Sequence, residues 1–135
     1  MSNTTTTLSP EKIQATIDRY FAATRSTNKA AEMVACFASN TVSYDPADGP
    51  ALKGHPGLLQ SFQQIGAFFT EIELAADFTA INGNEAAVKW SGKGIGKNGV
   101  AVTFEGIDLF KFSAAGQIQT LRAYWNPAPI IAKLQ

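Results

Sequence analysis

The feature that most constrains this chain is an acidic residue on the apolar face of a predicted strand. Residues 100–112 are predicted to form one strand, in which alternate side chains share a face. Apart from Asp108, one face is apolar: Val100, Val102, Phe104, Gly106, Phe110 and Phe112. The other face is mixed and can meet water: Ala101, Thr103, Glu105, Ile107, Leu109 and Lys111. Asp108 is therefore predicted to point at the apolar side of its own sheet.

The loop that follows this strand predicts its pairing with the next one. Ser113-Ala114-Ala115-Gly116 is typical of a four-residue hairpin loop, and loop length fixes the register of a hairpin. On this register Asp108 pairs with Leu121, while Arg122 goes to the opposite face. No cation is then expected beside Asp108 from this strand.

The preceding loop leaves two registers open. A three-residue loop over Lys97-Asn98-Gly99, with Gly99 left-handed, places Val88 beside Asp108. A two-residue Asn98-Gly99 turn would bring Lys89 there instead. We prefer the first register because it keeps Trp90 inside and Lys89 outside.

A buried carboxylate without a partner carries a penalty of roughly several kcal/mol and usually stays protonated. Burial disfavours the charged form, so the pKa of Asp108 should be raised. A neutral acid in a dry pocket is a hydrogen-bond donor. The alternative is a structural acid bonded to backbone or to a hydroxyl group. We favour a functional role, because ionisable groups are seldom buried unpaired.

Length and composition are typical of one soluble domain over residues 1–135. Hydrophobic residues make up 45%, and Lys plus Arg equals Asp plus Glu at 11 each, so no net field attracts nucleic acid or anionic membranes. The polar Met1–Thr7 segment lacks the apolar run of a signal peptide, and no stretch reaches the roughly 20 apolar residues of a membrane span. Cys36, the only cysteine, is predicted to lie in the core. A reducing, cytoplasmic location is expected.

Three N-terminal helices are predicted. The first has Ser9 as its cap and Pro10 in its first turn, with a buried stripe: Ile13, Ile17, Tyr20, Phe21 and Thr24. The second, short helix turns four residues inward: Ala30, Met33, Val34 and Phe37. The third runs from about His55-Pro56 to Phe69. His55 is interpreted as a cap or surface residue, and no grouping of residues has metal-ligand spacing, so neither a metal nor a cofactor is expected.

A brief strand, Thr41–Tyr44, is closed by Asp45-Pro46. Asp45 thus lies at the mouth of a strand, where catalytic side chains often project, although turn chemistry is its commoner role when it is taken alone. A meander of four strands follows. Its first strand, from Glu71 to Ile81, is predicted to turn five residues to one face: Ile72, Leu74, Ala76, Phe78 and Ala80.

Pro127 and Pro129 are predicted to end regular structure, leaving an apolar tail that could pack on a partner subunit: Ile130, Ile131 and Leu134. The expected architecture is α+β, with three N-terminal helices in the concave face of a curved, mostly antiparallel sheet. The cone between them would hold a small apolar ligand against five side chains: Phe62, Trp90, Phe104, Leu121 and Trp125.

Several segments occur in a recognisable order: Asp18-Arg19-Tyr20, Phe37-Ala38, Thr41-Val42, Asp45-Pro46, Gly54, Ile107-Asp108, Phe110-Lys111-Phe112 and Gly116 through Ala123. In this order the chain resembles the ketosteroid isomerase branch of the nuclear-transport-factor-2-like (SnoaL-like) superfamily, from about Ile13 to Trp125. The resemblance implies the NTF2-like, or cystatin-like, cone and a homodimer.

The resemblance also implies roles. Asp45 would be the base that moves a proton beside a ketone, nearer the solvent-facing mouth than Asp108. Tyr20 and protonated Asp108 would donate hydrogen bonds to the oxyanion of a dienolate. Phe62 and Phe37 stand where some members carry tyrosines, so Tyr20 would lack hydrogen-bonded neighbours. The expected activity is that of a steroid delta-isomerase-like enzyme, which shifts a double bond next to a ketone on a steroid-like or other fused-ring substrate. The alternatives are a SnoaL-like polyketide cyclase and a non-catalytic ligand-binding module.

Overall fold

The computed structural model describes residues 8–135, so the signal-peptide prediction for Met1–Thr7 lies outside the described residues. Within this range the helices are α1 (Pro10–Ala23), α2 (Lys29–Val34), α3 (Gly54–Gly66) and α4 (Ala128–Leu134). The strands are β1 (Val42–Ser43), β2 (Leu52–Lys53), β3 (Phe69–Asn82), β4 (Glu85–Gly96), β5 (Ala101–Phe112) and β6 (Ile118–Tyr124).

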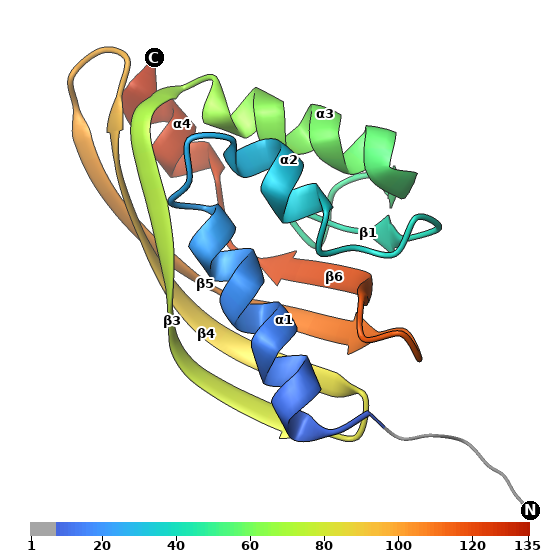
Figure 1. Cartoon of the computed structure of the whole chain (residues 1–135). Coiled ribbons are helices and arrows are strands. Elements are labelled where there is room, and N and C mark those ends of the chain that lie inside the picture. Colours follow the sequence, from blue (N-terminus) through green and yellow to red (C-terminus); the bar gives the residue numbers. More distant parts are fainter. Residues whose placement is uncertain (1–7) are drawn as a thin grey trace, which may run out of the picture.

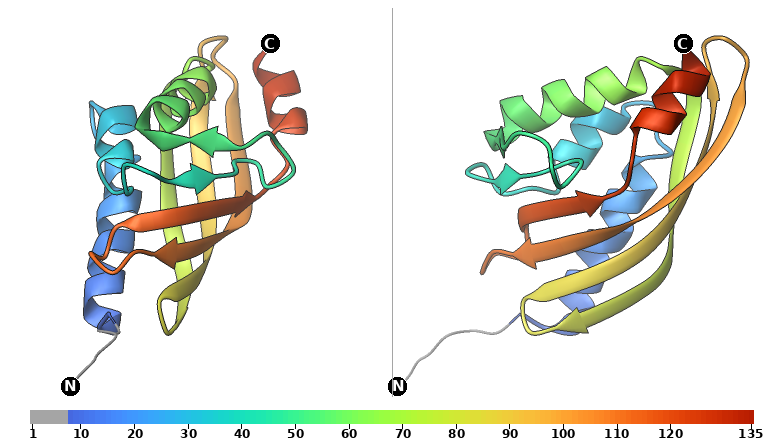
Figure 2. Two further views of the ribbon diagram at one scale, coloured as in Figure 1. Left: turned by 90° about the vertical axis from the view of Figure 1, so that its right-hand side faces the viewer. Right: turned by 180° about the vertical axis from the view of Figure 1, so that it is seen from behind.

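The main sheet has the antiparallel order β3-β4-β5-β6, and β1 and β2 form a separate two-stranded sheet. The long strands β3, β4 and β5 bend together, and helices α1, α2 and α3 lie on the inner side of the bend (Figures 1 and 2). This is the expected α+β arrangement of helices against a curved antiparallel sheet. No helix within residues 8–135 is long and apolar enough to cross a membrane.

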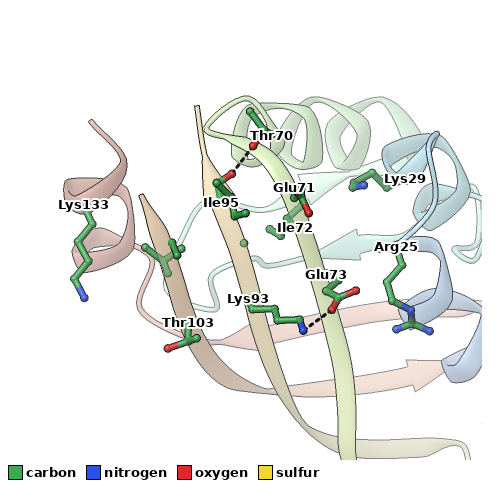
Figure 3. A pocket seen from close by; sticks show the side chains of 13 residues that line it. Arg25, Lys29, Thr70, Glu71, Ile72, Glu73, Lys93, Ile95, Thr103 and Lys133 are labelled. Carbon is green, nitrogen blue, oxygen red and sulfur yellow. Dashed lines mark hydrogen bonds and ion pairs between the residues drawn. The ribbon is translucent and has the colours of Figure 1, made fainter. Parts of the chain in front are cut away.

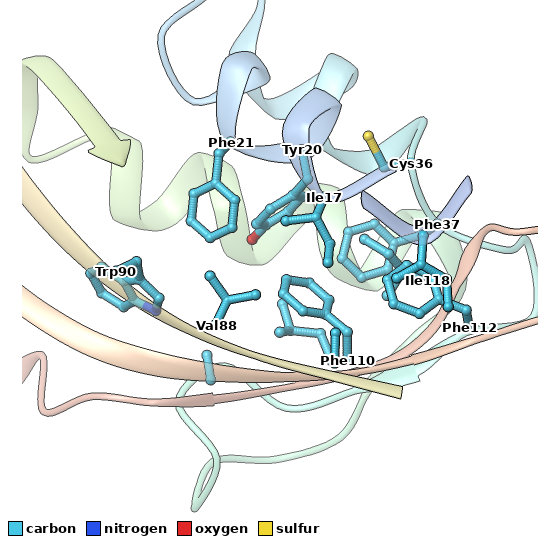
Figure 4. Close-up of a cluster of buried hydrophobic side chains, with 14 of the residues drawn as sticks. Ile17, Tyr20, Phe21, Cys36, Phe37, Val88, Trp90, Phe110, Phe112 and Ile118 are labelled. Atoms are coloured by element: carbon cyan, nitrogen blue, oxygen red, sulfur yellow. The ribbon is translucent and has the colours of Figure 1, made fainter. Parts of the chain in front are cut away.

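Helix α1 begins as its sequence predicts. The Ser9 hydroxyl oxygen accepts a hydrogen bond from the Lys12 backbone N–H at 3.1 Å, and Pro10 occupies the first turn. The predicted stripe is buried, with Ile13 and Ile17 fully enclosed. Figure 4 shows Ile17 and Tyr20 from α1 meeting Val88 and Phe110 from the sheet, so this helix closes the main core.

The preferred register between β4 and β5 is confirmed. Val88 pairs with Asp108, and Trp90 pairs with Gly106. Gly99 has φ +82°, the left-handed conformation expected for a three-residue loop. Lys89 lies on the outer face of the sheet, where its ammonium contacts the carboxylates of Asp77 at 3.3 Å and Glu105 at 3.0 Å.

The predicted register between β5 and β6 is wrong. Asp108 pairs with Ala123, and Leu121 pairs with Phe110 instead. Two one-residue changes add up to this difference. The Ser113 N–H donates to the Gln117 carbonyl at 2.8 Å, so the hairpin loop has three residues rather than four, and the pairing shifts by one more residue at an irregularity between Lys111 and Phe112. Because the total shift is two residues, the same side chains still face inward, but beyond the irregularity each residue of β6 pairs two residues further toward the C-terminus of β5.

A second irregularity corrects the predicted face of β3. The pairing of β3 with β4 shifts between Ala76 and Phe78, which changes the alternation of side chains. As a result Phe78, predicted to lie on the same face as Leu74, is 67% exposed.

The C-terminal segment is also not as predicted, since regular structure continues beyond the two prolines. Pro129 lies in the first turn of α4, where its missing N–H needs no partner. Ile130 and Leu134 pack on Phe69 and Val102 of the same chain. The apolar tail is therefore used within the chain as a fourth helix, and the homodimer stays a prediction from the resemblance.

Candidate active site

A cavity of about 290 Å³ lies between the inner face of the sheet and helices α1, α2 and α3. It gathers seven predicted site residues: Tyr20, Asp45, Phe62, Trp90, Phe104, Asp108 and Trp125. Leu121 does not line it. The corrected β5–β6 register moves Leu121 into the core beside Phe110 and puts Ala123 at the cavity wall opposite Asp108.

Asp108 reaches the cavity from β5 and is only 3% exposed. Its Oδ1 accepts a hydrogen bond from Trp90 Nε1 at 3.0 Å. Burial raises the pKa of Asp108 well above its usual value and nearby Asp45 raises it further, while the bond from Trp90 acts in the opposite direction. Burial therefore favours the protonated form of this acid.

The bond from Trp90 also determines which oxygen of Asp108 carries the proton. An indole N–H can only donate, so Oδ1 must act as an acceptor. The proton of neutral Asp108 then belongs on Oδ2. Asp108 lines the cavity, and within residues 8–135 its Oδ2 has no hydrogen-bond partner. This arrangement provides a carboxylic acid that can donate to a bound ligand.

Asp45 follows strand β1 and is placed by the backbone on either side of it. The N–H of Tyr44 donates to the carbonyl of Leu121 at 2.8 Å, and the N–H of Ala47 donates to that of Ala123 at 2.8 Å. The segment is thus tied to β6. The Asp45 Oδ1 accepts a hydrogen bond from Trp125 Nε1 at 2.8 Å, which leaves Oδ2 without a partner among residues 8–135.

Asp45 is half-buried, so it is more accessible than Asp108, as expected of a group nearer the mouth. Burial raises the pKa of Asp45 to about 6, and the bond from Trp125 opposes that rise. Above this pH the group is ionised. A carboxylate with a pKa close to neutral is well suited to both accept and return a proton.

Tyr20 reaches the cavity from α1 and is 2% exposed. Its ring is held edge-on by Phe21, Phe37 and Phe110, at centroid distances of 5.3, 5.8 and 5.6 Å. Figure 4 shows the hydroxyl on the side of Val88 and Trp90. Burial raises the pKa of Tyr20 well above 10, with Asp108 and Asp45 adding to the effect, so the group stays a phenol.

Within residues 8–135 the Tyr20 hydroxyl has no hydrogen-bond partner, and it is not sealed from solvent either. Phe37 and Phe62, whose rings lie 6.2 Å apart, provide apolar packing here instead of hydroxyl groups. Packing in the apolar core, rather than hydrogen bonding, therefore holds Tyr20 in place. Its O–H is left available to a ligand.

The aromatic side chains of the wall form one cluster. Phe104 lies 6.0 Å from Trp90 and 5.6 Å from Trp125, measured between ring centroids. The two indoles lie 6.0 Å from each other. Both indoles were predicted to form substrate-binding surface. Each also donates its N–H to one carboxyl group, so the same side chains line the cavity and position the acid-base groups.

Sequence reasoning missed several lining residues, mainly from the helices above the sheet: Thr24, Lys29, Ala30, Met33, Gln63, Ile65 and Gly66. A signal was present for Lys29. Met33 was predicted to point inward, and residues four apart on a helix share a face. His55, by contrast, lies outside the cavity lining, with Nε2 at 2.9 Å from the Phe37 carbonyl oxygen.

Comparisons with known proteins agree with this architecture. The family model of the SnoaL-like domain matches residues 17–121. No curated protein sequence matched the chain. An NTF2-like protein of unknown function from Burkholderia pseudomallei has a similar structure, with a TM-score of 0.78 and 16% identity over 92% of this chain and 98% of that one.

Two further solved structures are similar. A putative SnoaL-like polyketide cyclase from Jannaschia sp. has a TM-score of 0.79 at 14% identity, covering 96% of this chain and 97% of that one. A putative polyketide cyclase from Xanthomonas campestris has a TM-score of 0.75 at 19% identity, covering 93% and 98%. Identities this low show a shared NTF2-like fold and nothing finer. With the family match spanning most of the sequence, the chain belongs to the SnoaL-like domain family.

Proposed function

We propose that this protein is an isomerase that moves a carbon–carbon double bond next to a ketone by intramolecular proton transfer. One observation carries the proposal. An ionisable carboxylate with a pKa of about 6, a neutral carboxylic acid and a neutral phenol all line a single apolar cavity. Those are the groups needed to remove a proton beside a carbonyl and to stabilise the anion that results.

The first step removes a proton. The ketone oxygen of a β,γ-unsaturated substrate lies between the hydroxyl of Tyr20 and the Oδ2–H of Asp108. Oδ2 of Asp45 takes a proton from the carbon between the carbonyl and the double bond. The C–H electron pair forms the new carbon–carbon double bond of the dienolate, and the carbonyl π pair moves onto oxygen. Two preorganised donors in a dry site stabilise that oxyanion, each by about 3 kcal/mol.

The second step returns the same proton. Neutral Asp45 donates it to the γ-carbon, the electron pair of the dienolate oxygen re-forms the ketone, and the double bond ends conjugated with it. Substrate and product have the same composition, so no cofactor or co-reactant is required. Asp45 is ionised again and ready for another cycle.

The test is to offer a β,γ-unsaturated ketosteroid and follow the conjugated enone by its ultraviolet absorbance. We expect turnover by the native chain, and a loss of about 10²–10⁴-fold for Asp45→Asn, the range that a general base contributes. Asp48→Asn is the matched control, because Asp48 is exposed, lies three residues away and does not line the cavity. Absence of turnover by folded protein, or equal rates for Asp45→Asn and the native chain, would rule this reaction out.

A second candidate is cyclisation of a polyketide, favoured by the two structural neighbours described as putative polyketide cyclases. The same proton removal by Asp45 would give an enolate, whose carbon attacks a second carbonyl of the same molecule. The product then has a new ring carbon–carbon bond rather than a shifted double bond. Carbon NMR of the product from a linear polyketone separates the two reactions. If the protein is a binding module without chemistry, neither product should form, with the native chain or with Asp45→Asn.

A further inference from the structure

We propose that the natural substrate carries an anionic group, such as a carboxylate, at the end remote from its ketone, and that Lys29 pairs with this group at the mouth of the cavity. The inference rests on the proposed function for the placement of the ketone. It adds the chemical class of the substrate and the direction in which it enters.

Lys29 lies at the boundary between the cavity and the outer surface. It is the first residue of α2, is half-buried, and lines both the cavity and a shallow groove of about 730 Å³ on the outside of the molecule. Figure 3 shows that groove, with Lys29 and Arg25 across strand β3 from Lys93. The end of a bound ligand that points out of the cavity would therefore lie beside Lys29.

The ammonium group of Lys29 has donors to spare. It donates one hydrogen bond, to the Ser26 carbonyl at 2.9 Å, and an ammonium carries three protons. Within residues 8–135 no carboxylate oxygen lies within 4.0 Å of its Nζ. In the same groove Glu73 is already paired with Lys93 at 3.2 Å. Glu71 also lines the groove, but it forms no ion pair with Lys29, so Lys29 brings a positive charge to the cavity mouth without a paired carboxylate among residues 8–135.

Two other polar side chains in this region are less suited to bind an anion. The hydroxyl of Thr24 donates its one hydrogen to the Phe21 carbonyl at 2.6 Å and accepts from the Leu74 N–H at 3.0 Å, so it has no donor left for an anion. Arg25 donates to the Leu74 carbonyl at 2.9 Å and does not line the cavity. Lys29 is the single cation among the described lining residues.

Two charged lining residues would orient such a substrate. Ionised Asp45 repels an anionic group from the wall beside Trp125, whereas Lys29 attracts it to the boundary with the outer groove. The ketone then enters first, toward Tyr20 and Asp108. Fused-ring or planar ketones with a remote carboxylate fit this polarity better than wholly neutral ones.

The probes for the test are a hydroxynaphthoic acid, with hydroxyl and carboxylate at opposite ends of the rings, and its primary amide. Both share the planar phenol that imitates a dienolate and have nearly the same shape, and the remote group is charged in the acid and neutral in the amide. Binding to the full chain is measured by isothermal titration calorimetry at neutral pH and low salt. We expect the acid to bind about tenfold more tightly than the amide, equivalent to about 1.4 kcal/mol, and the preference to weaken at high salt.

Substitutions then assign the preference to one residue. Lys29→Met should abolish the preference for the acid over the amide, and Lys29→Arg should retain it. Lys93→Met is the matched control, because Lys93 lines the groove but not the cavity, and it should change neither probe.

The outcomes separate this inference from the proposed function. Equal binding of acid and amide, or a preference that survives Lys29→Met, overturns the role of Lys29 and leaves the donor pair intact. Failure of both probes to bind removes the dienolate site itself, and with it both proposals.

Discussion

At the scale of single residues, the same hydrogen-bond arrangement holds two acids of the candidate site that differ in acidity. Each carboxylate accepts an indole N–H on one oxygen and keeps the other for a ligand. What separates them is surroundings, since Asp108 is 3% exposed and Asp45 is half-buried. Desolvation therefore favours the protonated form of Asp108 more strongly than that of Asp45, which suits one to donate and the other to act as base.

This separation predicts the pH dependence of activity. The kcat/KM of isomerisation should rise with pH and level off above an inflection near the Asp45 pKa of about 6, because only the ionised form accepts a proton. The bond from Trp125 lowers that pKa, so Trp125→Phe should move the inflection to higher pH. A hydrogen bond to a charged group contributes about 1.5 kcal/mol, so activity below the inflection should fall about tenfold.

The control for this profile is Tyr124→Phe, since Tyr124 precedes Trp125 but is exposed and does not line the cavity. Its profile should overlay that of the native chain. An inflection that stays in place in Trp125→Phe would mean that the indole does not tune the base, whatever happens to the maximal rate.

At the scale of elements, the middle of β5 supports both carboxylates at once. A Cβ added at Gly106 would lie 2.6 Å from Trp90 Cζ2, 2.9 Å from Trp125 Cβ and 2.7 Å from the Tyr124 backbone oxygen. These approaches are too close for packed atoms, and one of them is to main chain. Only glycine lets the two indoles lie over this strand.

Gly106→Ala should therefore lower the free energy of unfolding by about 1–3 kcal/mol, the range for overpacking, and reduce kcat by displacing the indoles that hold Asp45 and Asp108. Urea denaturation measures the first effect and enone formation the second. Gly66→Ala is the stability control, because nothing lies within 4 Å of the added Cβ and alanine suits a helix. Unchanged stability and rate in Gly106→Ala would contradict the prediction, because they would show that β5 and the two indoles can move apart at no cost.

Local patterns predict the elements better than they predict how the elements pair. Tyr20 falls on the buried stripe of α1 by helical spacing, and Val88 pairs with Asp108 because Gly99 marks the loop. The shorter hairpin loop at Ser113 and the irregularity at Phe112 have no such marker. Together they exchange Leu121 for Ala123 at the cavity wall, so the position of Leu121 was predicted wrongly.

The irregularity beside Phe78 and the start of α4 were missed for different reasons. The pairing of β3 with β4 changes the alternation at Phe78. The prediction that Pro129 ends regular structure overlooked that proline is also favoured in the first turn of a helix. Lys29 escaped sequence reasoning because a lysine at the start of a short helix is usually solvated. Its position over the cavity is a property of the assembled helices and sheet.

At the scale of the whole molecule, burial of Asp108 and Asp45 in the cavity makes the neutral form of each acid more favourable in the folded chain than in the unfolded chain. Burial raises the pKa of Asp108 well above the ordinary value of 3.8, which the unfolded chain retains. Between those two pKa values the folded state binds more protons than the unfolded state. The contribution of Asp108 to stability is therefore fully present in acid and is lost progressively as pH rises.

Asp108→Asn removes this dependence while preserving the shape, because the amide oxygen can still accept from Trp90 Nε1 and the amide nitrogen can face the cavity as a donor. We expect its melting temperature to exceed that of the native chain at neutral pH by several degrees, which corresponds to a gain of about 1–2 kcal/mol, and the difference to vanish near pH ~3, where both chains are neutral at this position. Asp77→Asn provides the opposite sign, since the hydrogen bond from Ser91 lowers the pKa of Asp77 and the native carboxylate is favoured at neutral pH. Scanning calorimetry of the three chains across pH decides the matter: a gain that is the same at acidic and neutral pH would attribute the effect of Asp108→Asn to packing and would contradict a carboxyl group held neutral by burial.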